Sequence, residues 1–200
     1  MLLWGTMNLY SQEQTRTLLD VYCDMGNDAY GNGNYESAIN WFTKAAKYAK
    51  ESLGESHLDY ATLLYNSAFC YSSLGDYATA IKLYKQTLEI QKAVLGESHP
   101  DYATSLNNLA FCHHNLGDYT NAIELHKQAL KTIKAALGES HPDYAASLNN
   151  LALLYGELGD YANAIELFKQ ALKIEKVALS ESHPDYATSL NNLAICYKKL

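Results

Sequence analysis

The chain has 200 residues, of which 48% are hydrophobic, so it can bury a core and is not a disordered chain. Its formal net charge of −7 argues against binding to nucleic-acid phosphates, which requires a basic face. No apolar run approaches the roughly 18–20 residues that cross a bilayer, and the first residues, MLLWGTMNLY, lack the basic start of a signal peptide. We therefore expect a cytoplasmic (intracellular) protein with no membrane span and no nucleic-acid partner.

A stretch of 42 residues is repeated along the chain. Its period is set by four histidines, each 42 residues after the one before: His57, His99, His141 and His183. The second and third copies of the stretch differ at 11 of 42 positions, and a fainter earlier copy aligns Tyr35 with Tyr77. A fixed period of this length predicts a solenoid. The predicted divisions are an N-terminal extension at 1–14, a divergent first unit at 15–52, units at 53–94, 95–136 and 137–178, and a half unit at 179–200.

Each unit contains two helical patterns, called helix A and helix B below. In the unit 95–136 we expect helix A near 101–116 and helix B near 120–137, because apolar residues recur there at steps of three and four. Gly117 breaks the chain between them, and Pro100 stands at a helix start, where a missing N–H costs nothing. No strand-like alternation occurs. The sequence therefore predicts an all-α fold, an α-solenoid of antiparallel helix pairs.

The repeat resembles a known family. The pattern L-x-x-L-A-x-x-Y…G-D-Y-x-x-A-I-x-x-F-x-x-A-L at 148–172 is similar to the tetratricopeptide repeat (TPR). With LGESHPDYA between units, the 42-residue version resembles the repeats of kinesin light chains and nephrocystin-like proteins. The match departs at His113 and His126, which occupy aromatic positions, and at Gly26, which replaces an alanine. The resemblance implies a right-handed superhelix whose A helices line a concave groove for a partner's peptide.

The positions of helix A outside its apolar stripe are the candidate groove residues. An asparagine recurs there in every unit, and its amide can donate to and accept from the backbone of an extended peptide. The alternatives are hydrogen bonds between neighbouring A helices, or exposure to solvent without a role. One helix A position is apolar in the four units from residue 53 onward and holds Phe69, Phe111, Leu153 and Ile195. This row forms either pockets for the side chains of a peptide or ordinary contacts between adjacent A helices. The candidate peptide-binding residues are Asn66, Asn107, Asn108, Asn149, Asn150, Asn191, Asn192, Phe69, Phe111, Leu153, His114 and Asn115.

The groove positions favour a protein or peptide partner that is neutral or basic. None of the middle positions is Lys or Arg, whereas a groove for a C-terminal carboxylate needs a basic cluster. Five of the 11 differences between the second and third units are consecutive, at 111–115 against 153–157. This clustering is typical of a groove tuned along its length, and equally of drift at a tolerant surface.

The spacing of the histidines argues against a metal site, and the arrangement of the ESHPD segment argues against a catalytic triad. Histidines that occur once per unit lie roughly one helix-packing distance apart, about 10 Å, and cannot converge on one zinc ion. We interpret each as a linker or cap residue. The Ser-His-Asp letters of ESHPD are sequence neighbours, which rarely assemble a triad. Cys70, Cys112 and Cys196 share a repeat position with Leu154, which indicates a buried apolar site. We expect no enzymatic activity, no metal site and no cofactor.

The function predicted from these features is a non-enzymatic protein–protein interaction scaffold that binds a partner peptide or helix in the concave groove. The alternative is a structural element that stacks head-to-tail into oligomers or filaments. Helix A of the half unit 179–200 carries an apolar stripe that expects a helix B after it. Either the chain comes from a longer array, or this open C-terminal end docks on another molecule, including a second copy in a homo-oligomer.

Overall fold

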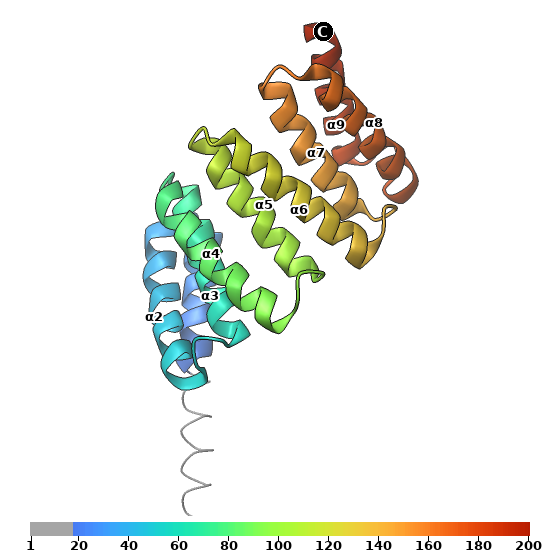
Figure 1. Cartoon of the computed structure of the whole chain (residues 1–200). Coiled ribbons are helices and arrows are strands. Elements are labelled where there is room, and N and C mark those ends of the chain that lie inside the picture. The colour runs from blue at the N-terminus through green and yellow to red at the C-terminus, as the bar shows by residue number, and fades with distance from the viewer. Residues whose placement is uncertain (1–17) are drawn as a thin grey trace, which may run out of the picture. The chain divides into compact units, whose positions relative to one another are not determined.

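The computed structural model describes residues 18–200, and every regular element in that range is helical (Figure 1). The predicted extension at 1–14 lies outside the described residues. A helix at 18–31 comes first. The following helices are α2 (Tyr35–Leu53), α3 (Leu58–Ser73), α4 (Tyr77–Val94), α5 (Pro100–Asn115), α6 (Tyr119–Leu137), α7 (Pro142–Glu157), α8 (Tyr161–Ala178) and α9 (Pro184–Lys199).

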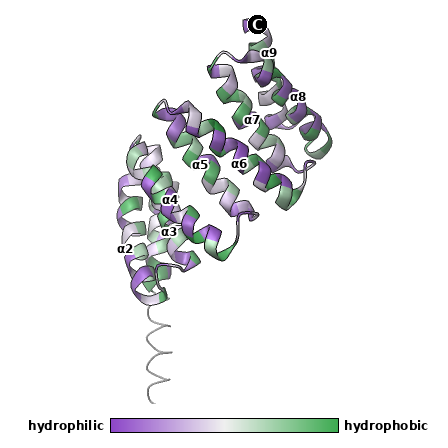
Figure 2. Cartoon of the chain, in the orientation of Figure 1, coloured by the Kyte–Doolittle hydropathy of each residue, from purple (hydrophilic) through white to green (hydrophobic). Residues whose placement is uncertain are grey.

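The helix order confirms the predicted all-α repeat fold. Helices α3, α5, α7 and α9 are A helices, and α4, α6 and α8 are B helices. Hydrophobic and hydrophilic residues both occur on each labelled helix (Figure 2), as expected of helices that bury one face. The predicted boundaries of the units, at residues 53, 95, 137 and 179, stay predictions.

A histidine caps the N-terminus of every A helix from α3 onward. In each case the imidazole Nδ1 accepts a hydrogen bond from the backbone N–H two residues later, as His99 does from Asp101 at 3.1 Å. Such a bond satisfies one of the N–H groups that the first helical turn leaves without a partner. The four capping residues are His57, His99, His141 and His183, so the interpretation of the histidine row as caps is confirmed.

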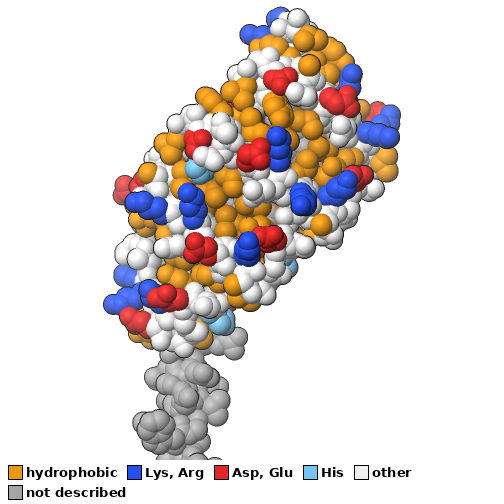
Figure 3. All heavy atoms as spheres, viewed as in Figure 1, with side chains coloured by type: hydrophobic (Ala, Val, Ile, Leu, Met, Phe, Trp, Pro, Cys, Tyr) orange, Lys and Arg blue, Asp and Glu red, His pale blue; other side chains and the backbone are white. Residues whose placement is uncertain are grey.

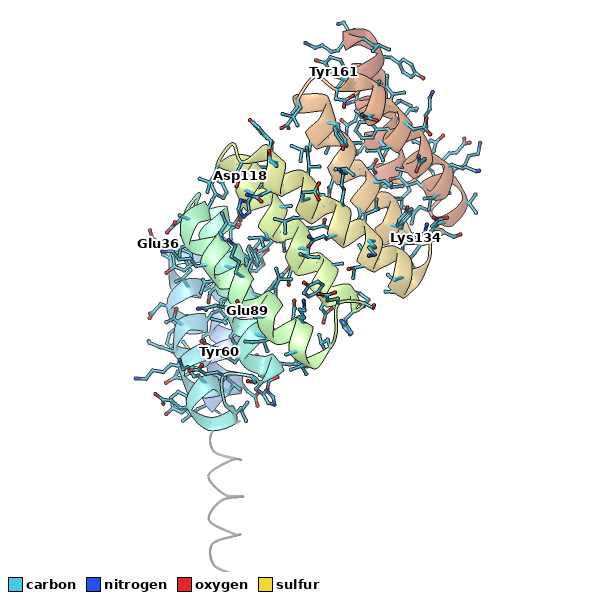
Figure 4. The ribbon with its side chains drawn as sticks, viewed as in Figure 1. Glu36, Tyr60, Glu89, Asp118, Lys134 and Tyr161 are labelled. Atoms are coloured by element: carbon cyan, nitrogen blue, oxygen red, sulfur yellow. The ribbon has the colours of Figure 1, made fainter. Side chains whose placement is uncertain are left out.

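The turn from helix A to helix B depends on glycine and aspartate. Gly117 and Gly159 have φ angles of 77° and 80°, a region that glycine enters without steric cost. Asp118, labelled at the α5–α6 turn in Figure 4, then caps α6, and its Oδ2 accepts from the Asn121 amide at 2.7 Å. Hydrogen bonds from Asn121 and, second, from His113 hold the pKa of the Asp118 carboxyl below its usual value. Local hydrogen bonds therefore stabilise the turn between α5 and α6.

The chain divides into two compact units between Val94 and Leu95. In the first unit α3 packs against α2 and α4. Its core includes the ring of Phe42, which is 2% exposed, together with alanines of α2 and Leu63 and Cys70 of α3. Phe42 also fills the space beside Gly26, where an added Cβ would lie 2.5 Å from the ring. The glycine that departs from the repeat pattern thus makes room for this ring.

In the second unit, α6 packs against α5 and α7, and α8 packs against α7 and α9. Fully buried alanines let the helices approach closely, among them Ala152 and Ala164, which pack with Phe168, Leu193 and Cys196. Positive and negative side chains are interspersed on the face shown in Figure 3, without a large area of one sign. The second unit therefore offers an apolar interior and a surface of mixed charge.

Candidate functional site

Asn107 ties three helices of the second unit together. Its Oδ1 accepts a hydrogen bond from Nδ1 of His126 on α6 at 2.9 Å. Its Nδ2 donates to Ser147 Oγ on α7 at 3.5 Å. This is hydrogen bonding between neighbouring A helices, one of the alternatives that the sequence leaves open for the asparagines.

Asn149, the same position 42 residues later, has different partners. Its Nδ2 donates to Glu175 Oε1 on α8 and to Ser189 Oγ on α9, each at 2.7 Å. Ser189 Oγ also donates to Glu175 Oε1 at 3.0 Å, and the Glu175 side chain is buried. Phe168 stands here in place of His126 and has no proton to donate, so the buried Asn149 Oδ1 has no hydrogen-bond partner.

Asn108 and Asn150 line a pocket between α5 and α7, called the α5–α7 pocket below. Its volume is about 280 Å³. Six of the predicted groove residues meet there, from both A helices, and the other three members come from α6 and α7. The lining residues are Asn107, Asn108, Phe111, His114, His126, Asn150, Leu153, Leu154 and Glu157.

The two segments in which neighbouring units differ most, 111–115 and 153–157, supply five of these lining residues. His114 Nε2 and Glu157 Oε2 are hydrogen-bonded to each other from α5 and α7. Phe111 and Leu153 are 49% and 43% exposed, so both offer apolar surface to solvent. The consecutive differences between the second and third units therefore fall on segments of α5 and α7 that line this pocket.

The α5–α7 pocket is polar at its floor and carries little charge. Burial lowers the pKa of His126 from 6.5 to about 4, with a smaller contribution from the charge of His114. His126 is therefore neutral at pH 7. Glu157 is the one carboxylate in the lining, and no Lys or Arg takes part in it. The pocket suits a neutral or positively charged group better than an anion.

A second pocket lies in the first unit, at the equivalent helix positions. It contains two of the predicted groove residues, Asn66 and Phe69, but its walls are mainly aromatic. Tyr30 and Phe69 form an edge-to-face pair with their ring centroids 5.7 Å apart. The lining residues are Asn27, Tyr30, Phe42, Tyr65, Asn66 and Phe69. The two units thus present pockets of different chemistry.

The remaining predicted residues are placed on the A helices but outside these two pockets. Asn115 is exposed and donates to the Phe111 carbonyl within its own helix at 2.8 Å. Asn191 is exposed and Asn192 half-buried on α9. The sequence does not identify His126 and Leu154 as lining residues, because the equivalent positions of other units hold buried residues and both therefore look like core positions. The one feature that could have identified His126 is that a polar residue occupies a repeat position that is otherwise aromatic.

In the range 18–200, no three side chains of His, Cys, Asp or Glu are grouped so that they could hold a metal ion. All four cysteines are free, and Cys70, Cys112 and Cys196 are buried as their exchange with leucine predicted. None of the helices described is both long and apolar enough to cross a membrane.

Comparison with known proteins places this fold among repeat proteins. The family model for the tetratricopeptide repeat matches residues 17–93, 59–119, 101–176 and 157–200. BtubC (BKLC) from P. vanneervenii has a TM-score of 0.83 and 23% identity over 98% of this chain and 78% of that chain. The nearly identical TPR-like repeats ascribed to a kinesin light chain of Podosopora anserina have a TM-score of 0.78 and 25% identity, over 92% and 87% of the two chains. No curated protein matches the chain.

Proposed function

Because the chain belongs to the tetratricopeptide repeat family, we propose that it is a non-enzymatic scaffold that binds a segment of a partner protein along its A helices. Repeats of this family generally mediate protein–protein interaction. The chain's own pockets are the proposed points of contact. Function is therefore assigned from the site, since the fold alone would fit many partners.

The α5–α7 pocket is the observation that carries this proposal. Asn108 and Asn150 stand 42 residues apart in sequence and place two amides in one lining. Amides spaced along neighbouring A helices can pair with the backbone of an extended segment without requiring particular side chains. Phe111 and Leu153 add apolar surface beside them, so side chains of the segment gain burial as well.

The partner segment is proposed to be neutral or basic. Lys and Arg are absent from the lining of the α5–α7 pocket, and its one carboxylate is Glu157. The whole chain carries a formal charge of −7, which speeds encounter with basic partners at low salt. The free cysteines are typical of a reducing compartment, and we propose the cytoplasm as the place of binding.

Selection from a library of random peptides tests this function directly. Peptides that bind the full chain are selected, synthesised and titrated into ¹⁵N-labelled protein. We expect the amide resonances of α5 and α7 around Asn108 and Asn150 to shift, and those on the outer faces of α6 and α8 to stay. If no peptide is enriched, or if the shifts fall only on the B helices, the proposal is wrong.

A second candidate function is self-association through α9. Leu190 on this helix is 49% exposed, whereas Leu148, its equivalent on α7, is 1% exposed and packs with Ala171 of α8. Ile195 and Tyr197 on α9 are also half exposed. A second copy that covered this face would bury the same apolar positions that a B helix buries elsewhere in the chain.

Light scattering over a concentration series tests the second candidate. Self-association predicts that the average mass rises with concentration and that Leu190→Lys holds the protein at the mass of one chain. The matched control is Val177→Lys, a change of equal charge at an apolar residue of α8 that is 86% exposed. A constant monomer mass at every concentration would remove the self-association candidate and leave the peptide scaffold untouched.

A further inference from the structure

The floor of the α5–α7 pocket contains a histidine with a defined pattern of protons. His126 Nδ1 lies 2.9 Å from Asn107 Oδ1, and a carbonyl oxygen only accepts, so Nδ1 carries the proton of this hydrogen bond. A neutral imidazole has one proton, which leaves Nε2 as an acceptor on the opposite edge of the ring. Nε2 has no hydrogen-bond partner among the described residues.

The orientation of the Asn107 amide supports this assignment. The equivalent Asn149 donates from Nδ2 to a carboxylate oxygen of Glu175 and to Ser189 Oγ, so its nitrogen must point that way. Asn107 directs its Nδ2 to Ser147, the residue equivalent to Ser189, and so repeats the arrangement of Asn149. Its oxygen then faces His126, and the reverse tautomer would bring two acceptors together.

The other groups of the pocket define what can approach Nε2. Phe111 of α5 and Leu153 of α7 provide exposed apolar surface. Glu157 of α7, which is hydrogen-bonded to His114, provides a carboxylate. A ligand group must therefore combine an apolar stem with a donor end that tolerates or prefers a negative neighbour. A lysine side chain has these features, with four methylene groups and an ammonium that only donates.

We propose that the α5–α7 pocket binds a lysine side chain of the partner segment, with the ammonium donating to His126 Nε2 beside Glu157. This inference rests on the proposed peptide-binding function and names the side chain that the second unit selects. The stem lies between Phe111 and Leu153, and the backbone of the segment runs past the amides of Asn108 and Asn150. His126 is then a specificity-determining residue.

The experiment uses the peptides selected from the random library. Sequencing should show lysine enriched at one position of the binding peptides. Each such peptide is compared with a version that has norleucine at that position, which keeps an apolar stem and removes the ammonium. We expect norleucine to weaken binding to the full chain about tenfold, a change of about 1.4 kcal/mol.

His126→Phe is the matched variant, because the third unit already carries phenylalanine at this position, in Phe168. Toward this variant the lysine and norleucine peptides should differ less than twofold. An equal preference for lysine in the variant would assign it to the general negative charge of the chain and overturn the inference. Enrichment of a hydroxyl or acidic residue at that position would overturn it as well, while peptide binding itself would stand.

The imidazole ¹⁵N spectrum of the unaltered chain gives a second, independent test. Without peptide, His126 should show a protonated Nδ1 and an unprotonated Nε2. Adding the lysine peptide should shift the Nε2 resonance, and adding the norleucine peptide should not. An unmoved Nε2 with bound lysine peptide would overturn the role of His126, whereas failure of every peptide to bind would overturn the proposed function itself.

Discussion

His126 Nδ1 and Asn107 Oδ1 form a hydrogen bond of 2.9 Å that joins α6 to α5. The same two repeat positions hold Tyr65 and Tyr84 in the first unit, whose rings pack edge to face with centroids 5.6 Å apart. The same contact between helices A and B is therefore a hydrogen bond in one repeat and an aromatic contact in the neighbouring repeat. In the second unit, the hydrogen-bonded ring of His126 is also part of the lining of the α5–α7 pocket.

The burial of His126 should make stability depend on pH. Its pKa falls from 6.5 to about 4 in the folded chain, so between these values the unfolded state binds more protons. Stability is therefore full above pH 6.5 and is lost as the pH falls to about 4, by about 3 kcal/mol in total. Urea unfolding curves at a series of pH values measure this loss.

The control for the pH effect is His126→Phe, which removes the titrating ring and keeps the other six histidines. The difference in unfolding free energy between the two proteins should change in favour of the variant as the pH falls from 6.5 to 4. A difference that stays constant over that range would show that His126 is not held neutral by burial.

The unpartnered Asn149 Oδ1 predicts an unusual tolerance of Phe168→His. The new imidazole can donate to Asn149 as His126 donates to Asn107, so the variant should lose no more than about 1 kcal/mol at pH 8. The matched control is Phe42→His at the same repeat position, where Cys23 stands in place of the asparagine. That variant buries an unpaired polar ring and should lose about 2 kcal/mol more. Equal losses in urea unfolding would contradict this account.

Two glycines should respond to alanine in opposite directions. Gly26→Ala places a Cβ 2.5 Å from the buried ring of Phe42, and the forced shift should cost about 1–3 kcal/mol. Gly156→Ala in α7 meets Cys196 Sγ at an ordinary 3.5 Å and should stabilise the helix by about 0.5–1 kcal/mol. The melting temperature should fall in Gly26→Ala and rise in Gly156→Ala. Changes of the same sign in both variants would contradict the packing described.

Ser180 stands where the earlier units have glycine. Its φ is 88°, while Gly96 and Gly138 at the equivalent positions have 83° and 84°. A residue with a Cβ pays roughly 1 kcal/mol or more for a left-handed backbone, so Ser180→Gly should raise the unfolding free energy by about 1 kcal/mol. Ser182→Gly, in the same loop, is the control and should not stabilise. A Ser180→Gly variant no more stable than the parent would count against the strain.

The fold could be read from the sequence because repetition exposes it. One substitution pattern that occurs four times separates core from surface, so the sequence alone predicts helix starts such as Pro100 and caps such as His99. In the sequence, Gly26 is only a departure from the repeat pattern. Its cause, the ring of Phe42, needed the position of a side chain on another helix.

The candidate site was predicted less completely than the fold. Helix periodicity identifies the exposed side of an A helix, and so Asn108 and Asn150 were selected together. It does not tell whether an amide points outward or toward a neighbouring helix, since that depends on partners such as Ser147 and Glu175 far along the chain. The place of His126 in the pocket lining cannot be predicted for the same reason, because a core position and a buried lining position show the same pattern in the sequence.

The most direct test of the scaffold role is the affinity of a library-selected peptide for the double variant Asn108→Ala with Asn150→Ala. We predict at least a tenfold loss of affinity, about 1.4 kcal/mol, measured well below the melting temperature of the variant. The matched control changes two exposed glutamines of the B helices, Gln128→Ala with Gln170→Ala, and should bind as the parent does. Unchanged affinity in the asparagine variant, or an equal loss in the glutamine variant, would contradict binding along the A helices.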